Sequence, residues 1–295
     1  MGGRSGVRLL ATIALSYCLS IFLVIIITGV IILRTVLNPW YILSRMEHSG
    51  FIEQSAIELR EVFISYGLGS GVDREIMEPL VTDAHIAEAA EGLILQKYGR
   101  SSGYSFEQYS NEIYVALSNY VLSMGLQITE DVQTGLRDLA DLSVDAVRNH
   151  LDSVVIQVLA QTQRYTRIMY IAVAIVSVLT IATIIIIPSV NRRVTRWIDG
   201  YIYALGAASL LCIVIPILYF QTGISTRLQV EPLSYFMLIT SWLDGIFSGF
   251  LSALIPLVVL IIICVIIRVQ RRKKREKRKR YLEYNSYDGY NTGGI

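Results

Sequence analysis

Four long stretches of the chain contain no charged residue, and the segments between them are polar. These stretches are residues 9–33, 168–191, 200–226 and 245–267. Each reaches the roughly 20 residues that an α-helix needs to cross the hydrocarbon core of a bilayer. The pattern therefore predicts four transmembrane helices, at residues 9–33, 168–190, 201–221 and 245–267.

The polar segment between the first two predicted spans, residues 34–167, has the periodicity of amphipathic helices. Its apolar residues recur at three- and four-residue steps. Thr82, Ser105 and Thr129 stand where helix N-caps are expected, and Gly99 and Gly125 where helices stop. A first helix is predicted on Ile52, Ala56, Leu59, Phe63 and Tyr66, ended by Gly67, Gly69 and Gly71. A later one is predicted on Phe106, Tyr109, Ile113, Leu117, Tyr120 and Met124. The predicted fold is all-α, with an extracytoplasmic helical bundle inserted between spans 1 and 2.

The last helix of this segment has no stop signal in the sequence. Between Gly135 and Pro188 there is neither glycine nor proline. A continuous helix, forming a rigid stalk that runs into the second span, is therefore predicted. Its predicted apolar face consists of Val132, Leu136, Leu139, Leu142, Val147, Leu151, Val154 and Val158.

The distribution of charged residues along the chain predicts its orientation in the membrane. Arg4 and Arg8 precede the first span, Arg192, Arg193 and Arg196 lie near the start of the third, and a basic cluster follows the fourth. Residues 35–167 instead carry nine basic and eighteen acidic side chains, a net charge of −9. The positive-inside rule therefore places both termini and the loop 191–200 in the cytoplasm. The predicted order is a cytoplasmic N-terminus (1–8), the first span, an extracytoplasmic domain (34–167), the second span, the cytoplasmic loop, the third span, an outer loop (222–244), the fourth span and a cytoplasmic tail (268–295). A multi-pass protein of the plasma membrane is expected.

Composition supports a membrane protein and offers little catalytic chemistry. The chain is 53% hydrophobic and 17% charged. Its three cysteines, Cys18, Cys212 and Cys264, all lie in the apolar stretches, so no disulfide framework is expected. His85 and Glu88 share a helix face and could supply two metal ligands, but surface polar residues are the simpler interpretation. No catalytic motif and no phosphate-binding loop is present, so neither an enzyme nor a cofactor is expected.

The predicted spans carry no ionisable group at their centres, which disfavours an ion-coupled transporter. Small residues recur on the fourth span at Gly245, Gly249 and Ala253. Such a ridge allows close helix packing, either within the chain or between copies in a homo-oligomer.

The tail combines a basic half with a tyrosine-rich half. The basic residues are Arg268, Arg271, Arg272, Lys273, Lys274, Arg275, Lys277, Arg278, Lys279 and Arg280. Directly behind a span, they favour binding to the bilayer through anionic lipid headgroups rather than to nucleic acid. Tyr281, Tyr284, Tyr287 and Tyr290 follow, in a composition expected to be disordered. Phosphorylation there would place negative charge beside the cluster and release it.

Two resemblances follow from these patterns. The segment LSRMEHSGFIEQSAIELREVFISYGLGSGVDREIMEPLVT, residues 43–82, resembles the outer segment of uncharacterised four-span membrane proteins of Gram-positive bacteria, a resemblance that implies no activity. The order of spans and loops is similar in topology alone to FtsX- and MacB-type subunits of ABC transporters. Those subunits begin with a longer cytoplasmic helix and have mixed α/β outer domains, whereas this chain has eight residues before its first span and a helical outer segment.

The expected function is therefore that of a non-enzymatic membrane protein with an outer helical sensor or interaction domain and a protein partner. The alternative is a permease-like subunit that works with a separate ABC ATPase.

Overall fold

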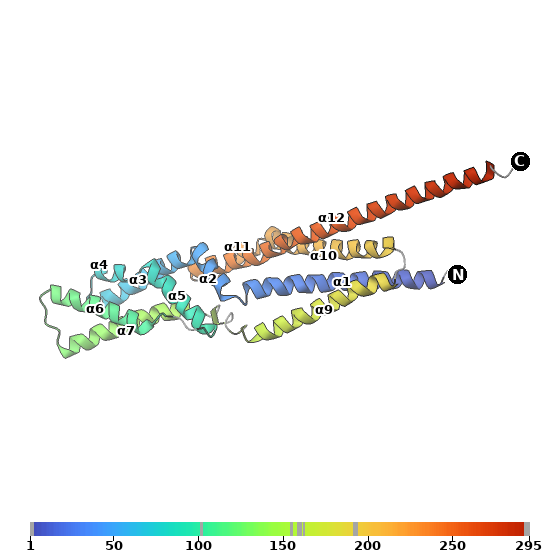
Figure 1. The fold of residues 1–295 in the computed structure, drawn as a ribbon. Helices are drawn as coiled ribbons and strands as arrows, with labels where there is room; N and C mark the ends of the chain where they lie inside the picture. Colours follow the sequence, from blue (N-terminus) through green and yellow to red (C-terminus); the bar gives the residue numbers. More distant parts are fainter. Residues whose placement is uncertain are drawn as a thin grey trace. The chain divides into compact units, whose positions relative to one another are not determined.

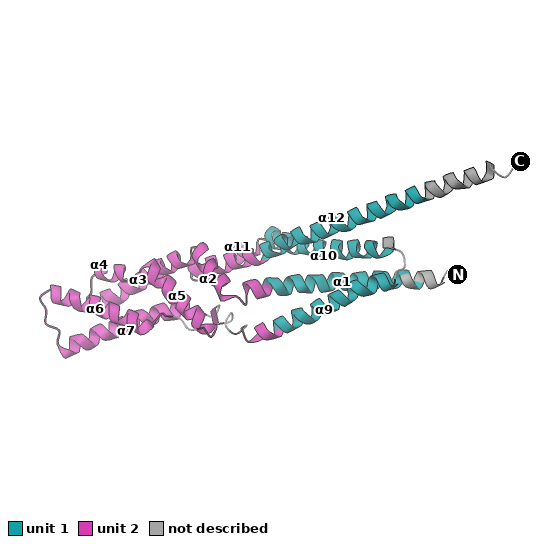
Figure 2. Ribbon diagram, viewed as in Figure 1, with its two compact units in different colours: residues 1–31, 169–222, 247–295 teal, residues 32–168, 223–246 magenta. Residues whose placement is uncertain are grey.

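The computed structural model describes residues 3–100, 103–153, 156–157, 161, 163–190 and 194–291, and over these ranges the fold is helical without a β-strand (Figure 1). The chain divides into two compact units (Figure 2). Unit 1 consists of residues 1–31, 169–222 and 247–295, and unit 2 of residues 32–168 and 223–246. The helices α1 (Gly3–Thr35) and α12 (Leu233–Asn291) have residues in both units.

Unit 1 consists of long apolar helices. Besides parts of α1 and α12 it holds α9 (Thr166–Val190), apart from its first three residues, and α10 (Val194–Thr222). Four helical segments are long and apolar enough to cross a membrane: Leu9–Thr35, Thr166–Val190, Arg196–Thr222 and a segment of α12 within Leu233–Arg278. The prediction of four such helices is confirmed. In lipid a helix satisfies its own backbone groups, which is why charge-free sequence of this length is stable in that form.

Small residues bring the helices of unit 1 close together. A Cβ atom added to Gly29 of α1 would lie 2.5 Å from the side chain of Val173 on α9. One added to Gly200 of α10 would lie 2.8 Å from Ser16 Oγ on α1. These distances leave no room for any larger residue at the two crossings.

Unit 2 is a bundle of shorter helices. They are α2 (Pro39–His48), α3 (Phe51–Gly69), α4 (Arg74–Met77), the 3-10 turn η1 (Glu78–Leu80), α5 (Asp83–Lys97), α6 (Phe106–Ser123) and α7 (Glu130–Leu151). The turn η2 (Gln163–Tyr165), the short α11 (Ile224–Arg227) and the start of α12 complete the unit.

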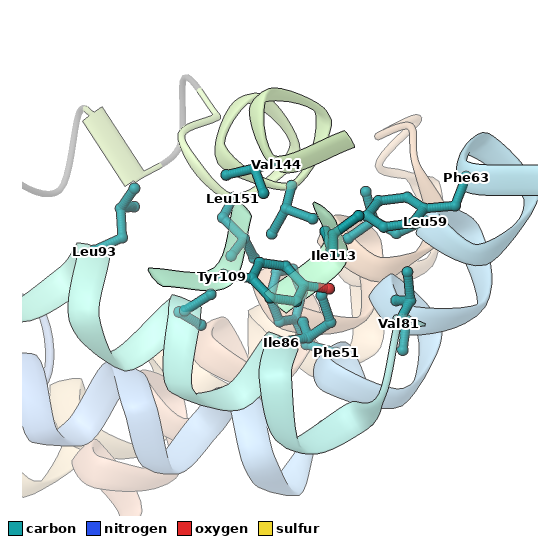
Figure 3. Close-up of a cluster of buried hydrophobic side chains, with 14 of the residues drawn as sticks. Phe51, Leu59, Phe63, Val81, Ile86, Leu93, Tyr109, Ile113, Val144 and Leu151 are labelled. Carbon is teal, nitrogen blue, oxygen red and sulfur yellow. The ribbon is translucent and has the colours of Figure 1, made fainter. Parts of the chain in front are cut away.

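The core of unit 2 is one apolar cluster to which α3, α5, α6 and α7 all contribute (Figure 3). Phe51 and Phe63 of α3 have no exposed surface, and Ile86 of α5, Ile113 of α6 and Val147 of α7 are at most 1% exposed. Burying such side chains stabilises a fold by ~1.5–3 kcal/mol each. The predicted apolar positions of α3 and α6 lie at this core, except that Met124 is half exposed.

The predicted N-caps are confirmed at two positions. Thr82 Oγ1 accepts a hydrogen bond from the backbone N–H of His85 at 3.2 Å, and Ser105 Oγ accepts one from that of Gln108 at 3.3 Å. The Gln108 side chain does not complete a capping box, because its amide donates to Glu112 instead, at 3.1 Å. The start of α7 after Thr129 is also as predicted, although the Thr129 side chain makes no capping bond.

Two glycines predicted only as helix stops have different roles. Gly71 has a φ of 76°, a left-handed conformation that glycine adopts without strain. Gly67 lies inside α3 and is buried, and a Cβ atom there would overlap Cγ of Met77. Gly67 therefore allows α4 to pack tightly against α3.

The prediction of a continuous stalk is wrong. Helix α7 ends at Leu151, and Asp152 and Ser153 are not helical. The hydroxyl of Tyr235, from the first turn of α12, donates to the backbone carbonyl oxygens of His150, at 2.6 Å, and Leu151, at 3.2 Å. It satisfies carbonyl groups that otherwise lack partners at a helix end, so the chain can leave the helix there. Val154 and Val158 of the predicted face lie outside the described residues.

The predicted apolar face of α7 is also partly wrong. Val132 is 37% and Leu142 49% exposed, whereas Ala140, Ser143 and Val144 are buried. Repeated steps of three residues drift around a helix of 3.6 residues per turn, so Leu142 falls beside the buried stripe. The small Ala140 and Ser143 lie on the stripe instead.

Two segments near the C-terminus are more helical than predicted. Residues 222–244, predicted to form a loop, contain α11 and the first three turns of α12. The tail continues α12 to Asn291, including the tyrosine-rich half that was predicted to be disordered. No proline or glycine interrupts residues 257–288, and the Lys, Arg and Glu of the basic half are strong helix formers.

Candidate functional site

A buried polar cluster joins three helices of unit 2. Glu58 comes from α3, His150 from the last turn of α7 and Ser234 from the first turn of α12. Ser234 Oγ donates to Glu58 Oε2 at 2.7 Å, and the Ser234 backbone N–H donates to Glu58 Oε1 at 3.1 Å. His150 Nε2 lies 3.6 Å from Glu58 Oε2 and 3.5 Å from Ser234 Oγ. We call these three residues the polar joint.

The N-terminal end of α12 determines the electrostatic environment of Glu58 in the polar joint. The Glu58 carboxylate accepts from a first-turn N–H of α12 and lies at the positive end of that helix dipole. The Ser234 residue has no exposed surface, and the side chains of His150 and Glu58 are 14% and 20% exposed. Burial lowers the pKa of His150, and the Glu58 carboxylate acts in the opposite direction. Burial thus favours the neutral imidazole of His150 in the polar joint.

Apolar contacts surround the polar joint. The ring of Tyr235 packs edge-on against Phe51, with ring centroids 5.1 Å apart, and lies 5.8 Å from the ring of His150. Tyr235 and Leu238 belong to the buried core of unit 2. The first turns of α12 are therefore built into the bundle by both polar and apolar contacts.

The residue types of the polar joint also occur in hydrolase triads, but its geometry differs from one. A serine nucleophile donates its proton to a basic imidazole. Here the Ser234 hydroxyl donates to a carboxylate and is fully buried. The contacts of the polar joint instead connect the three helices that contribute its residues.

Sequence reasoning missed the polar joint entirely. Ser234 is 176 residues from Glu58 and 84 from His150. No local motif links residues at such separations, so the sequence carries no signal for the cluster.

A second feature of unit 2 is a negatively charged cavity of about 650 Å³ between α5 and α6. The predicted pair His85 and Glu88 lines it together with Glu112 and Tyr104. Burial and the carboxylates of Glu88 and Glu112 raise the pKa of Tyr104 to about 12. Nδ1 of His85 lies 3.3 Å from the carbonyl oxygen of Leu80. Within the described ranges, no three potential metal ligands come together here or elsewhere.

The main feature of unit 1 is a groove of about 590 Å³ between α1 and α10. One face of each helix lines it, from Leu9 to Ser20 on α1 and from Arg196 to Ala207 on α10. Beside the groove, Asp199 Oδ1 lies 2.8 Å from Nε of Arg268 on α12.

Arg268 is thus the one member of the predicted basic cluster in an ion pair with another helix, among the residues that the structure describes. The other cluster residues whose side chains are described are exposed on α12, and Arg272 pairs with Glu276 one turn later, at 3.2 Å. Tyr281, Tyr284, Tyr287 and Tyr290 lie on the same helix, and their side chains are outside the described part.

The predicted packing residues of α12 contact different helices. A Cβ atom on Gly245 would overlap the Tyr41 hydroxyl oxygen of α2, within unit 2. One on Gly249 would lie 3.5 Å from Ile31 of α1, within unit 1. Ala253 is half-buried. Both glycines therefore have neighbours within the same chain.

Comparison of the chain with protein-family models, with curated proteins and with solved structures finds no match.

Proposed function

We propose that the chain is a multi-pass protein of the plasma membrane whose helical unit 2 is an outer interaction domain, coupled to the fourth span. The observation that carries this proposal is the polar joint. Because Ser234 begins α12, a change in the packing of α3 or α7 alters the contacts that hold the start of a membrane-crossing helix. The function is communication between an outer partner and the membrane, without catalysis.

The apolar surface of unit 1 supports the membrane part of the proposal. Ile181, Ile185 and Ile255 are 57%, 63% and 68% exposed. Soluble proteins rarely expose apolar surface on this scale, whereas lipid solvates it. Charge supports the orientation, since unit 2 is acidic and the tail basic. In this orientation residues 34–167 are extracytoplasmic and both termini cytoplasmic.

The end of the α6–α7 hairpin supports an interaction role for unit 2. Leu122, Met124 and Leu126 are each more than half exposed at this turn. Neighbouring exposed apolar side chains on an otherwise acidic domain are typical of a protein contact surface. The partner is therefore expected to be a protein that covers this turn.

Photo-crosslinking in native membranes tests the proposal. A photoreactive residue at Leu126 should give a discrete adduct with another protein, whereas the same residue at Glu107, exposed at the start of α6, should not. Recovery of a P-loop ATPase bound to the tail or to residues 191–200, with no adduct from Leu126, would contradict the proposal. That result would favour the permease-like alternative.

A further inference from the structure

One face of α1 and one face of α10 line the groove between these helices. On α1, every third or fourth residue from Leu9 to Ser20 lines it, and on α10 the same holds from Arg196 to Ala207. At ~1.5 Å rise per residue, the α10 side extends along the helix for about 16 Å. Tyr17 and Tyr203 at its edges are 67% and 73% exposed, so the groove opens onto the surroundings of unit 1.

The floor of the groove is closed where the two helices meet. The missing side chain of Gly200 brings the α10 backbone against Ser16 and Thr12 of α1. Ser16 Oγ donates to the carbonyl oxygen of Thr12 at 2.8 Å, and Ser20 Oγ to that of Tyr17 at 2.8 Å. Because these hydroxyl protons are used within α1, they offer no donor to a polar ligand. The body of the groove suits an alkyl chain.

One end of the groove is positively charged. Arg196 lies in the first turn of α10, eleven residues before Ala207. Asp199 is neutralised by Arg268 through the 2.8 Å ion pair. None of the described carboxylates lies within 4.0 Å of the Arg196 guanidinium. The side chains of Arg196, Asp199 and Arg268 therefore carry a net charge of +1 at this end of the groove. This charge can bind a phosphate group.

We propose that this groove binds one anionic phospholipid, with an acyl chain against Ile13 and Ala207 and the phosphate at Arg196. The inference rests on the membrane location proposed above. A volume of about 590 Å³ falls within the ~300–1,000 Å³ of ordinary ligand sites. The site differs from the basic tail, where exposed charges attract any anionic surface and are screened by salt.

Native mass spectrometry of the purified full chain tests this proposal with phosphatidylglycerol and phosphatidylcholine of the same acyl chains. The wild-type protein should retain one phosphatidylglycerol per chain, with at least tenfold preference over phosphatidylcholine. Arg196→Gln should remove this preference. The matched control is Arg272→Gln, which removes an equal charge from the exposed tail and should retain the bound lipid.

Two further experiments distinguish binding of the lipid's acyl chain from binding of its headgroup. Ala207→Phe keeps all charges but fills the groove at an exposed position, so it should abolish retention of the lipid. An excess of glycerol phosphate, which has the anion without acyl chains, should leave the lipid bound. Equal retention of the two lipids, equal loss in Arg196→Gln and Arg272→Gln, full retention in Ala207→Phe, or displacement by glycerol phosphate would each overturn the proposal.

Alkaline carbonate extraction distinguishes failure of this site from failure of the membrane proposal. A wild-type protein that stays in the membrane pellet but shows no lipid preference overturns the lipid site alone. Release of the protein into the supernatant overturns the membrane location as well.

Discussion

The two units differ in the side chains that they bury and in those that they expose. In unit 2 the interior holds Phe51, Phe63 and other large apolar groups, and most charged residues outside the polar joint lie at the surface. In unit 1 many large apolar residues face outward, and the buried residues combine large ones, such as Leu19, Ile187 and Ile198, with small or hydroxyl-bearing ones, namely Ser16, Ser20, Thr180, Thr183, Ala204 and Ala208. The hydroxyls of Thr180 and Thr183 donate to carbonyl oxygens four residues earlier in α9, both at 2.8 Å.

This difference shows which force stabilises each unit. Burial of apolar surface away from water stabilises unit 2. In lipid that driving force between helices is absent, so unit 1 depends on close packing at small residues such as Gly29 and Gly200. The following substitutions test this contrast, from the largest expected effect to the smallest.

Removing a phenylalanine side chain should lower stability more in unit 2 than in unit 1. Phe63→Ala leaves a cavity at a fully buried position of α3 and should cost about 3–5 kcal/mol. Phe220 of α10 is 50% exposed, so Phe220→Ala should cost less than about 0.5 kcal/mol, as substitutions away from packed sites do. Hydrogen–deuterium exchange of the α3 and α5–α7 amides measures the first loss. Equal, small changes in both variants would contradict the account.

Adding a charged side chain should have a larger effect in unit 1 than in unit 2. Ile185→Arg places a guanidinium on the exposed apolar face of α9, five residues before the helix ends, and should reduce membrane insertion by less than the ~2.5–3.5 kcal/mol that a charge costs at a helix centre. Val115→Arg, at a half-exposed position of α6, should leave insertion unchanged because unit 2 is solvated by water. Insertion of each variant can be quantified by glycosylation mapping in microsomes. A tolerated Ile185→Arg would indicate that α9 does not face lipid.

Loss of the carboxylate from the polar joint should loosen unit 2 at the start of α12. Glu58→Gln replaces one acceptor oxygen by an amide that cannot accept from Ser234, at a cost of about 1–3 kcal/mol. The control is Glu61→Gln on the same helix, whose side chain is 69% exposed and 3.5 Å from Arg74. A lower thermal midpoint is expected for Glu58→Gln alone, and equal midpoints would refute the stabilising role of the joint.

The smallest effect should come from pH. Burial lowers the pKa of His150 in the folded state, so below its ordinary value of about 6.5 the unfolded chain binds a proton that the folded chain does not. This contribution to stability is present above pH 6.5 and is lost as the pH falls below it. Unfolding midpoints at pH 7.5 and 5.5 should therefore differ more for the wild-type protein than for His150→Gln. The same difference in both proteins would mean that His150 does not titrate in this way.

The sequence predicted those features that local chemistry determines. The absence of charge over 20 or more residues is sufficient to locate a long apolar helix, and the hydroxyls of Thr82 and Ser105 are sufficient to locate helix starts. The periodicity of α3 also identified three of its buried residues, Ala56, Leu59 and Phe63, although it missed Phe51 and Ile64. In each case the deciding interaction lies within a few residues along the chain.

Features that depend on distant residues could not be predicted in the same way. Helix α7 ends where Tyr235, 84 residues later, supplies the hydroxyl that caps its carbonyl groups. The polar joint assembles Glu58, His150 and Ser234 from three separate helices. The groove of unit 1 exists because Gly200 meets Ser16, a contact that neither helix reveals by itself.

Cysteine accessibility in intact cells tests most directly the central claim that water solvates unit 2 outside the cell and lipid solvates unit 1. Cys18, Cys212 and Cys264 are replaced by alanine, and single cysteines are introduced by Val115→Cys, Ile185→Cys and Arg272→Cys. A membrane-impermeant maleimide should label Val115→Cys in intact cells, Arg272→Cys only after permeabilisation, and Ile185→Cys only after denaturation. Labelling of Ile185→Cys in intact cells, or of Val115→Cys only after permeabilisation, would contradict the account.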